Sequence, residues 1–341
     1  MSRVARRISI APIRALATPP SETGVLVEQR SLDTALRGKT ARRVRATLRR
    51  MEPVVVLAPR WGATTQFLED LALDLAVGEP AIGCRTVSFR PIKGRSLTEA
   101  WLFTLHIFGQ LGHRGWRPSA LPTVVDRRGF RWALDQLLEE AHKTSRHRVA
   151  LLAHEAEHLP MEIVEDIGAV WTEYLDRHPE ARRCAILLSG TASERWLTLG
   201  GAPRIELTDY GEEEAVAAIV GRAGPIPVRQ AELAARFSGG IPGLVESFGK
   251  QGRALGRLPV KREELMASLG PLADEMRGAV DIVAAHDELS DRLSLLLHGE
   301  PVAADEQLDT PLVLAGLARR VRGTEGAQVM LRAPAIAALV G

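Results

Sequence analysis

The fold is decided by residues 54–65, which read VVVLAPRWGATT. Four consecutive apolar residues, 54–57, predict a buried strand, and residues 64–77 have the apolar periodicity of an amphipathic helix. The loop between them is in register with G-x-x-x-x-G-K-[ST], a pattern in which main-chain N–H groups and a lysine bind phosphate. The order of strand, loop and helix therefore predicts a phosphate-binding loop.

This loop departs from the pattern at most of its defined positions. Ala58 and Ala63 stand where the glycines belong, and Thr64 stands where the lysine belongs. Thr65 alone keeps its residue type. A register that uses Gly62 as the second glycine also lacks the lysine.

Two residues of the loop offer partial replacements for what is missing. Arg60 can stand in for the lysine, because a guanidinium binds phosphate at two points. Trp61 either fills space in the emptied phosphate pocket or stacks on a base. The candidate nucleotide-binding residues are Pro59, Arg60, Trp61, Gly62, Ala63, Thr64 and Thr65.

A second motif occupies residues 149–155, VALLAHE. In a working site of this kind an apolar strand ends in Asp-Glu, where the aspartate orients Mg²⁺ and the glutamate polarises the attacking water. Here His154 replaces the aspartate, whereas Glu155 is retained as the candidate catalytic residue. Each lost charged contact is worth roughly 1.5–3 kcal/mol. Losing two removes about 10²- to 10⁴-fold in affinity or rate, so fast ATP turnover is not expected.

Strands and helices alternate through the first 210 residues. Apolar runs predict further strands at 84–89, 149–153, 184–189 and 204–207, and amphipathic patterns predict further helices at 31–50, 96–111, 127–143 and 161–177. Ser96 and Glu99 have capping-box spacing. Short apolar strands separated by helices favour a parallel sheet that helices cover on both faces. We therefore expect an α/β P-loop domain, a sheet sandwiched by helices, over residues 31–210.

The pattern changes on either side of this domain. Residues 211–285 predict a helical lid. Residues 286–341 predict helices at 289–297 and 311–320 and then a wing at 328–332, which is the order of a winged-helix-like domain. Residues 1–30 predict a basic flexible arm. The first 50 residues hold twelve lysines and arginines against three acidic residues, a net charge of +9 in a chain of overall charge +2. Such a segment suits organellar targeting or contact with nucleic acid or a partner protein.

The composition and the cysteine positions indicate where in the cell we expect the protein. The chain is 45% hydrophobic and 25% charged, and its apolar runs are far shorter than the roughly 20 residues of a membrane span. Cys84 and Cys184 fall in predicted strands, which is typical of buried thiols in a reducing compartment. We expect a cytoplasmic protein without a membrane partner.

In this order the motifs resemble those of AAA-like (AAA+) ATPases of the STAND and transposon-helper type. The resemblance rests on residues 58–68, 151–160, 186–191 and 238–245, and with weaker C-terminal motifs it spans about residues 25–341. It marks Ser189 and Thr191 as sensor-like residues. It implies ATP or ADP with Mg²⁺ as cofactor, and other protein components or further copies of the chain as partners. The implied setting is a bacterial defence or mobile-element system.

Residues 154–158, HEAEH, support a rival interpretation. In H-E-x-x-H two histidines on one helix face bind zinc while the glutamate activates water, which makes His154 and His158 alternative zinc ligands. The preceding apolar run is short and strand-like, however, and Pro160 would end such a helix just beyond its second ligand. Ordinary histidines at a strand end are the favoured interpretation.

The winged helix supplies a possible DNA contact. Arg319, Arg320 and Arg322 follow its second predicted helix, and Arg332 lies on the predicted wing, so all four are candidate phosphate contacts. Acidic residues just upstream oppose DNA binding, and in related ATPases such a domain often contacts protein.

Taken together, the sequence favours a pseudo-ATPase or weak ATP binder that acts as a regulatory or scaffolding component. A pseudo-ATPase would need no cofactor. One alternative is an active ATPase that uses Arg60 and Glu155, and another is a zinc metallopeptidase.

Overall fold

The computed structural model describes residues 38–78, 81–111, 126–145, 147–180, 182–192, 197–323 and 326–340. The expected basic arm, residues 1–30, lies outside the described residues. None of the helices in these ranges is long and apolar enough to cross a membrane.

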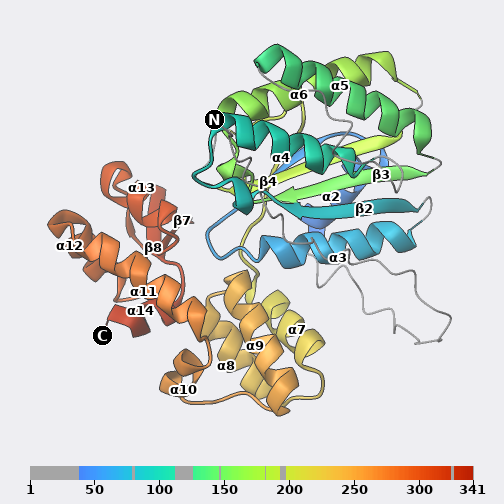
Figure 1. Ribbon diagram of the computed structural model, residues 1–341. Coiled ribbons are helices and arrows are strands. Elements are labelled where there is room, and N and C mark those ends of the chain that lie inside the picture. Colours follow the sequence, from blue (N-terminus) through green and yellow to red (C-terminus); the bar gives the residue numbers. More distant parts are fainter. Residues whose placement is uncertain are drawn as a thin grey trace, which may run out of the picture. The chain divides into compact units, whose positions relative to one another are not determined.

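A five-stranded parallel sheet forms the first part of the fold (Figure 1). Its strands are β1 (Val54–Ala58), β2 (Ile82–Ser88), β3 (Arg148–His154), β4 (Cys184–Thr191) and β5 (Arg204–Glu206). Their order across the sheet is β2-β3-β4-β1-β5, and every neighbouring pair is parallel. Strand β4 therefore separates β1, which leads into the phosphate loop, from β3, which ends in the second motif.

Helices cover both faces of the sheet, as the apolar strands predict. Helices α2 (Gly38–Arg49) and α3 (Thr64–Val77) cover one face, and α4 (Leu97–Gly109), α5 (Arg127–Thr144) and α6 (Met161–Arg177) cover the other. Alternate residues of β1 point to opposite faces, so Val54 joins the core with α2 and α3, whereas Val55 joins the core with α4 to α6. The expected α/β P-loop fold is confirmed.

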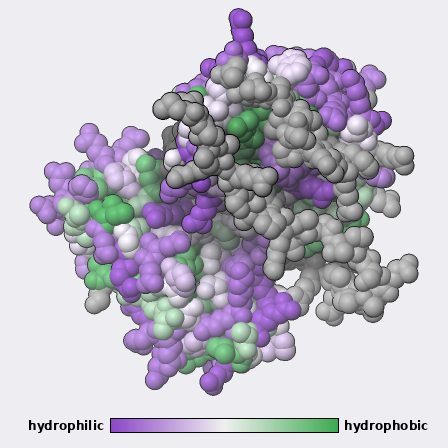
Figure 2. All heavy atoms as spheres, in the orientation of Figure 1, coloured by the Kyte–Doolittle hydropathy of each residue, from purple (hydrophilic) through white to green (hydrophobic). Residues whose placement is uncertain are grey.

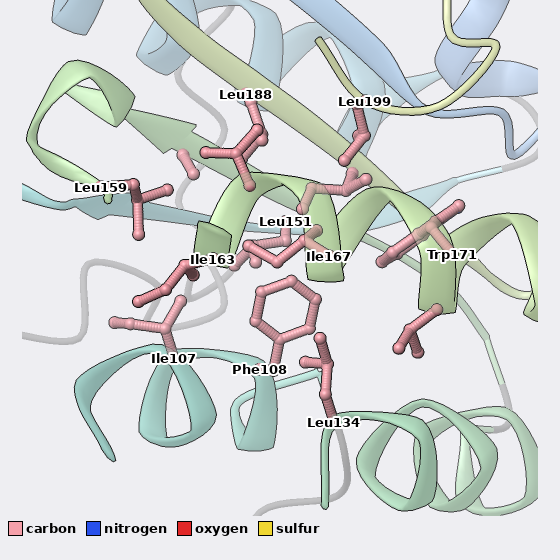
Figure 3. Close-up of a cluster of buried hydrophobic side chains, with 14 of the residues drawn as sticks. Ile107, Phe108, Leu134, Leu151, Leu159, Ile163, Ile167, Trp171, Leu188 and Leu199 are labelled. Atoms are coloured by element: carbon pink, nitrogen blue, oxygen red, sulfur yellow. The ribbon is translucent and has the colours of Figure 1, made fainter. Parts of the chain in front are cut away.

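The larger core lies between the sheet and α4 to α6. Figure 3 shows Leu151 of β3 and Leu188 of β4 near Ile167 of α6. Phe108 of α4 and Leu134 of α5 lie on the side of α6 away from the sheet. All five side chains are buried. At the start of α4 the Ser96 side chain accepts a hydrogen bond from Glu99 N, and the Glu99 carboxylate accepts one from Ser96 N. The predicted capping box is therefore confirmed.

The second part of the chain is mainly helical. It contains α7 (Glu212–Ala223), α8 (Val228–Ser238), α9 (Pro242–Leu255), α10 (Arg262–Ala267) and α11 (Pro271–Ala284). After them come α12 (Asp287–Leu296), β6 (Val302–Ala303), α13 (Glu306–Leu314), β7 (Ala318–Gly323), β8 (Gly326–Leu331) and α14 (Pro334–Val340). Their buried apolar side chains form one continuous cluster, so the expected lid and the C-terminal segment share a core.

One helix of this part differs from its prediction. We expected residues 311–320 to be helical, but α13 spans Glu306–Leu314. It begins early because the Asp305 carboxylate accepts hydrogen bonds from the N–H groups of Gln307 and Leu308. It ends early because Gly316 has φ +81°, a left-handed conformation that stops a helix. Residues 318–323 then form strand β7, which pairs with β8.

On the face shown in Figure 2 most of the described residues are hydrophilic, and the hydrophobic ones form several small groups. Helices α12 and α13, which pack against each other, carry two of the exposed apolar side chains. Leu295 of α12 and Leu314 of α13 are about half exposed, at 53% and 49%.

Candidate functional site

The phosphate loop lies between a strand and a helix, as in the phosphate-binding pattern, although the glycines and the lysine of that pattern are missing. Strand β1 runs directly into Pro59, and helix α3 begins at Thr64, as predicted. Ala63 has φ 50° and ψ 42°, a left-handed conformation, at the position of the second glycine. A left-handed backbone costs a residue with a Cβ about 1–2 kcal/mol. Ala63 therefore adopts the left-handed conformation for which the pattern uses glycine, at an energetic cost.

The loop is closely packed around Gly62. A Cβ added to Gly62 would lie 2.6 Å from the carbonyl oxygen of Pro59 and 2.8 Å from the Cβ of Ala58. Trp61 is also left-handed, with φ 58°. No side chain caps α3, so the N-terminal N–H groups of this helix keep a partial positive charge. Thr65, which kept its residue type, is exposed on the first turn of α3.

Trp61 packs against the lid and the C-terminal segment. Its half-buried ring joins their hydrophobic cluster, and its carbonyl oxygen accepts a hydrogen bond from Gly243 N at 2.8 Å. A Cβ on Gly316 would lie 3.0 Å from the Trp61 ring, so glycine is needed for this approach. The guanidinium carbon of Arg60 lies 5.3 Å from the centre of the same ring, within the range of a cation–π contact. Trp61 therefore fills space against the lid and the C-terminal segment.

Arg332 fastens the C-terminal segment to the phosphate loop. It forms a two-point salt bridge with Asp209, at 2.6 and 2.8 Å, and its Nη1 donates to the carbonyl oxygen of Arg60 at 2.7 Å. Its side chain is only 3% exposed. We expected Arg332 to contact nucleic acid from a wing, and this expectation needs correction because the buried guanidinium is already engaged inside the protein.

A second charged contact joins α3 to the lid. Arg222 of α7 lies 3.2 Å from Asp70 of α3 and 3.4 Å from Glu246 of α9, and Lys250 lies 2.9 Å from Glu246. Burial raises the pKa of Asp70, whereas hydrogen bonds from Gln66 and Arg222 oppose that rise. The sequence analysis missed this set, because no local pattern relates residues of α3 to residues of α7 and α9.

At the second motif the Glu155 carboxylate accepts a hydrogen bond from within the protein. Glu155 follows β3 with φ 58°, and Ser88 Oγ at the end of β2 donates a hydrogen bond to it. The same hydroxyl accepts a hydrogen bond from Arg90 N at 3.0 Å, just before the short helix η1 (Arg90–Ile92). Glu155 thus anchors the exit of β2. Carboxyl ends of parallel strands meet at one edge, so the position of Ser88 was a usable signal that the sequence analysis missed.

His154 occupies the position of the metal-binding aspartate. It pairs across the sheet with Ser88, and its Nδ1 lies 3.5 Å from Glu155 Oε2. Burial lowers the pKa of His154, and the Glu155 carboxylate opposes that shift. Burial therefore favours the neutral imidazole, which supplies none of the negative charge that an aspartate brings to Mg²⁺.

The sensor-like residues lie at the same edge of the sheet. Ser189 is buried and donates from Oγ to the carbonyl oxygen of Ala153 at 3.2 Å. Thr191 pairs with Ala58 in the register of β4 and β1, so it lies beside the start of the loop. The structure therefore brings Thr191 to the loop, whereas the Ser189 hydroxyl bonds within the sheet.

The loop lacks the charges of an ATP–Mg²⁺ site, because Thr64 stands at the position of the phosphate-binding lysine and His154 at that of the magnesium-binding aspartate. The lid and the C-terminal segment bond to the carbonyl oxygens of Trp61 and Arg60, through Gly243 N and Arg332. A cavity beside the start of α3 measures about 10 Å³, room for about one water molecule. Its lining residues are Ala63, Gln66, Phe67, Asp70, Tyr210, Arg222 and Glu246.

The zinc interpretation of HEAEH has no support in the structure. His154 ends strand β3, and His158 ends the short 3-10 helix η3 (Ala156–His158), so the two do not share the face of an α-helix. Among the described residues no group of three or more His, Cys, Asp or Glu side chains is arranged to hold a metal ion.

The other candidate phosphate contacts lie on strand β7. Arg320 and Arg322 are exposed, and Arg319 is half-buried. Arg320 Nη2 donates to Thr310 Oγ1 at 2.9 Å. These arginines therefore lie within a strand that comes after helix α13, and their role in binding nucleic acid stays a prediction.

The strand order, the loop and the two motifs define the fold of a P-loop ATPase. No family model matches the sequence, and no curated protein matches it. Among solved structures, a Walker-type ATPase of Pyrococcus abyssi has a similar fold over 89% of this chain and 95% of its own, with a TM-score of 0.54 and 14% identity.

Two further solved structures are more distant. A RuvB Holliday-junction branch-migration motor of Thermotoga maritima matches at a TM-score of 0.42 and 14% identity, over 88% of this chain and 90% of its own. A STAND protein with a tetratricopeptide repeat sensor from Pyrococcus horikoshii matches at a TM-score of 0.41 and 12% identity, over 88% of this chain and 41% of its own.

Proposed function

We propose that this chain is a pseudo-ATPase, a P-loop ATPase fold that no longer hydrolyses ATP and acts as a regulatory or scaffolding component of a multi-protein system. One observation carries the proposal: the chain's own lid and C-terminal segment bind the phosphate loop. Gly243 N bonds to Trp61, and Arg332 bonds to Arg60. In a working site a ligand between loop and lid would have to displace these contacts.

The missing charges support the same conclusion. Thr64 replaces the lysine that neutralises phosphate, and His154 replaces the aspartate that orients Mg²⁺. Arg60 lies against the Trp61 ring, and Glu155 is bonded to Ser88, and these contacts support the pseudo-ATPase over the active-ATPase alternative.

The partners that we propose are other protein components or further copies of the chain, in the cytoplasm of a bacterium. The exposed apolar side chains of α12 and α13 support a protein contact. The order α12, β6, α13, β7 and β8 supports the winged-helix assignment for the C-terminal segment. The defence or mobile-element setting rests on the resemblance of the motifs.

Calorimetry and phosphate release test the proposal directly. ATP titrated into the purified chain, with and without Mg²⁺, should give no saturable heat, and phosphate release should stay at the background rate. Micromolar ATP binding that Arg60→Ala abolishes would establish the active-site alternative instead. As a scaffold, the chain should keep the same molar mass by light scattering whether or not ATP is added.

A further inference from the structure

Five arginines gather where strands β1, β3 and β4 begin, at the edge of the sheet opposite the phosphate loop. We call this group the basic edge. It consists of Arg49, Arg50, Arg148, Arg182 and Arg183. The strands are parallel, so their amino ends meet along one edge although these residues are far apart in the sequence.

Direct contacts tie the five residues together. Arg148 Nη1 donates to the carbonyl oxygen of Arg49 at 3.0 Å, which joins the start of β3 to the end of α2. The N–H of Val149 donates to the carbonyl oxygen of Arg183 at 2.8 Å, which places Arg183 beside Arg148.

Arg50 and Arg182 share one carboxylate. Arg50 Nη2 lies 2.9 Å from Glu52 Oε2, and Arg182 Nη1 lies 3.7 Å from Glu52 Oε1. Among the described residues, Glu52 is the acidic residue that forms ion pairs with the basic edge, and it pairs with Arg50 and Arg182. The group therefore carries a large excess of positive charge.

Arginines elsewhere in the fold are paired differently. Arg127 bonds to Asp166, Arg177 to Asp135 and Arg292 to Asp309. At the basic edge, Arg148 and Arg183 instead donate to the main-chain carbonyls of Arg49 and Ser145. A carbonyl neutralises no charge, so Arg148 and Arg183 keep their full positive charge.

Two further donors at the basic edge have no acceptor. The Nε atoms of Arg49 and Arg182 are buried and have no hydrogen-bond partner among the described residues. These two atoms are buried, so an anion at the surface can bond only to the outer guanidinium nitrogens of such arginines, where their positive charge attracts it.

The positive surface continues along helix α2. Its sequence, GKTARRVRATLR, contains no acidic residue, and Arg42 and Arg43 are both exposed. Helix α2 ends at Arg49, in the basic edge. A run of cations of this extent matches a polyanion better than a single small anion.

We propose that the basic edge binds the phosphate backbone of double-stranded DNA. Guanidinium groups suit this ligand, because each one can bond to phosphate oxygens at two points. A duplex presents regularly spaced phosphates along its length, which matches exposed arginines both at the strand ends and along α2. This surface is distinct from β7 and does not depend on the state of the phosphate loop.

Fluorescence anisotropy with a short labelled DNA duplex and the full chain tests the proposal. Arg148→Ala/Arg183→Ala should weaken binding and reduce the slope of log K against log salt by about 2, near 0.9 for each lost phosphate contact. Both side chains are exposed, so the variant should fold, and circular dichroism checks this. Arg148→Lys/Arg183→Lys keeps the charge and should keep most of the slope.

The matched control is Arg253→Ala/Arg257→Ala, which removes two exposed arginines at the end of α9 and just after it. Its binding and slope should equal those of the unchanged chain. The proposal is overturned if the edge variant binds DNA as the unchanged chain does, if the α9 control loses as much affinity, or if labelled polyglutamate binds at the edge while the duplex does not.

Discussion

Arg332 and Asp209 form a two-point salt bridge across 123 residues of sequence, and Arg332 also bonds to the carbonyl oxygen of Arg60. One side chain thus joins the C-terminal segment, the strand-to-lid connection and the phosphate loop. These contacts hold the C-terminal segment to the loop through the protein's own groups.

Removing Arg332 should therefore be costly. Arg332→Ala leaves the Asp209 carboxylate without its partner, and we expect the free energy of unfolding to fall by about 3–5 kcal/mol. Urea denaturation measures this. Arg236→Ala, which breaks the exposed pair with Glu212, should cost far less, because solvent screens that pair. Equal effects of the two variants would show that the Arg332 contact is not specially important.

Restoring the second glycine of the loop should stabilise the protein. Ala63 is left-handed, so Ala63→Gly relieves backbone strain and should add about 0.5–1 kcal/mol after the extra entropy of the unfolded chain is counted. Ala72 lies inside the right-handed helix α3, where the same change should cost about 1 kcal/mol. Thermal unfolding should show shifts of opposite sign, and a loss of stability in Ala63→Gly would contradict the strain argument.

The glycine pair at the end of α8 should tolerate no side chain. A Cβ on Gly240, which has φ +79°, would collide with the carbonyl oxygen of Tyr210. Gly256 has a similar φ of +67° but open space around it. Gly240→Ala should therefore cost about 1–3 kcal/mol more than Gly256→Ala, because only the former adds a clash to the strain. Similar unfolding midpoints for the two variants would rule this out.

Stability should fall as the pH falls below about 6.5, the ordinary pKa of histidine. Burial lowers the pKa of His154 in the folded state, so the unfolded chain takes up the proton more readily and gains from acid. His154→Gln should reduce the loss of unfolding free energy between about pH 7 and about pH 5. His147→Gln, at an exposed position, should not. Identical pH profiles for both variants would exclude His154 as the cause.

The fold follows from local patterns in the sequence. Apolar runs such as residues 54–57 and 149–153 became β1 and β3 because strands covered on both faces need continuous apolar residues. The edge carrying Ala58, Glu155 and Thr191 also followed, since carboxyl ends of parallel strands share one edge.

The contacts between the phosphate loop and the rest of the chain could not be predicted from local sequence patterns. Arg332 meets Asp209 through packing of the whole chain, and alternation around residues 328–332 indicated only a strand, not which side chain is buried. Gly316 did carry a signal, because a glycine within a helical pattern often ends the helix, and using it would have placed the end of α13 correctly.

The tight contact between loop and lid sets which substitutions these positions accept. Gly240, Gly243 and Gly316 leave no room for a methyl group. We therefore expect proteins that share this contact to keep the three glycines and to vary more at Thr64. In such proteins the glycines of the lid contact should identify the fold better than the residues of the phosphate-binding motif.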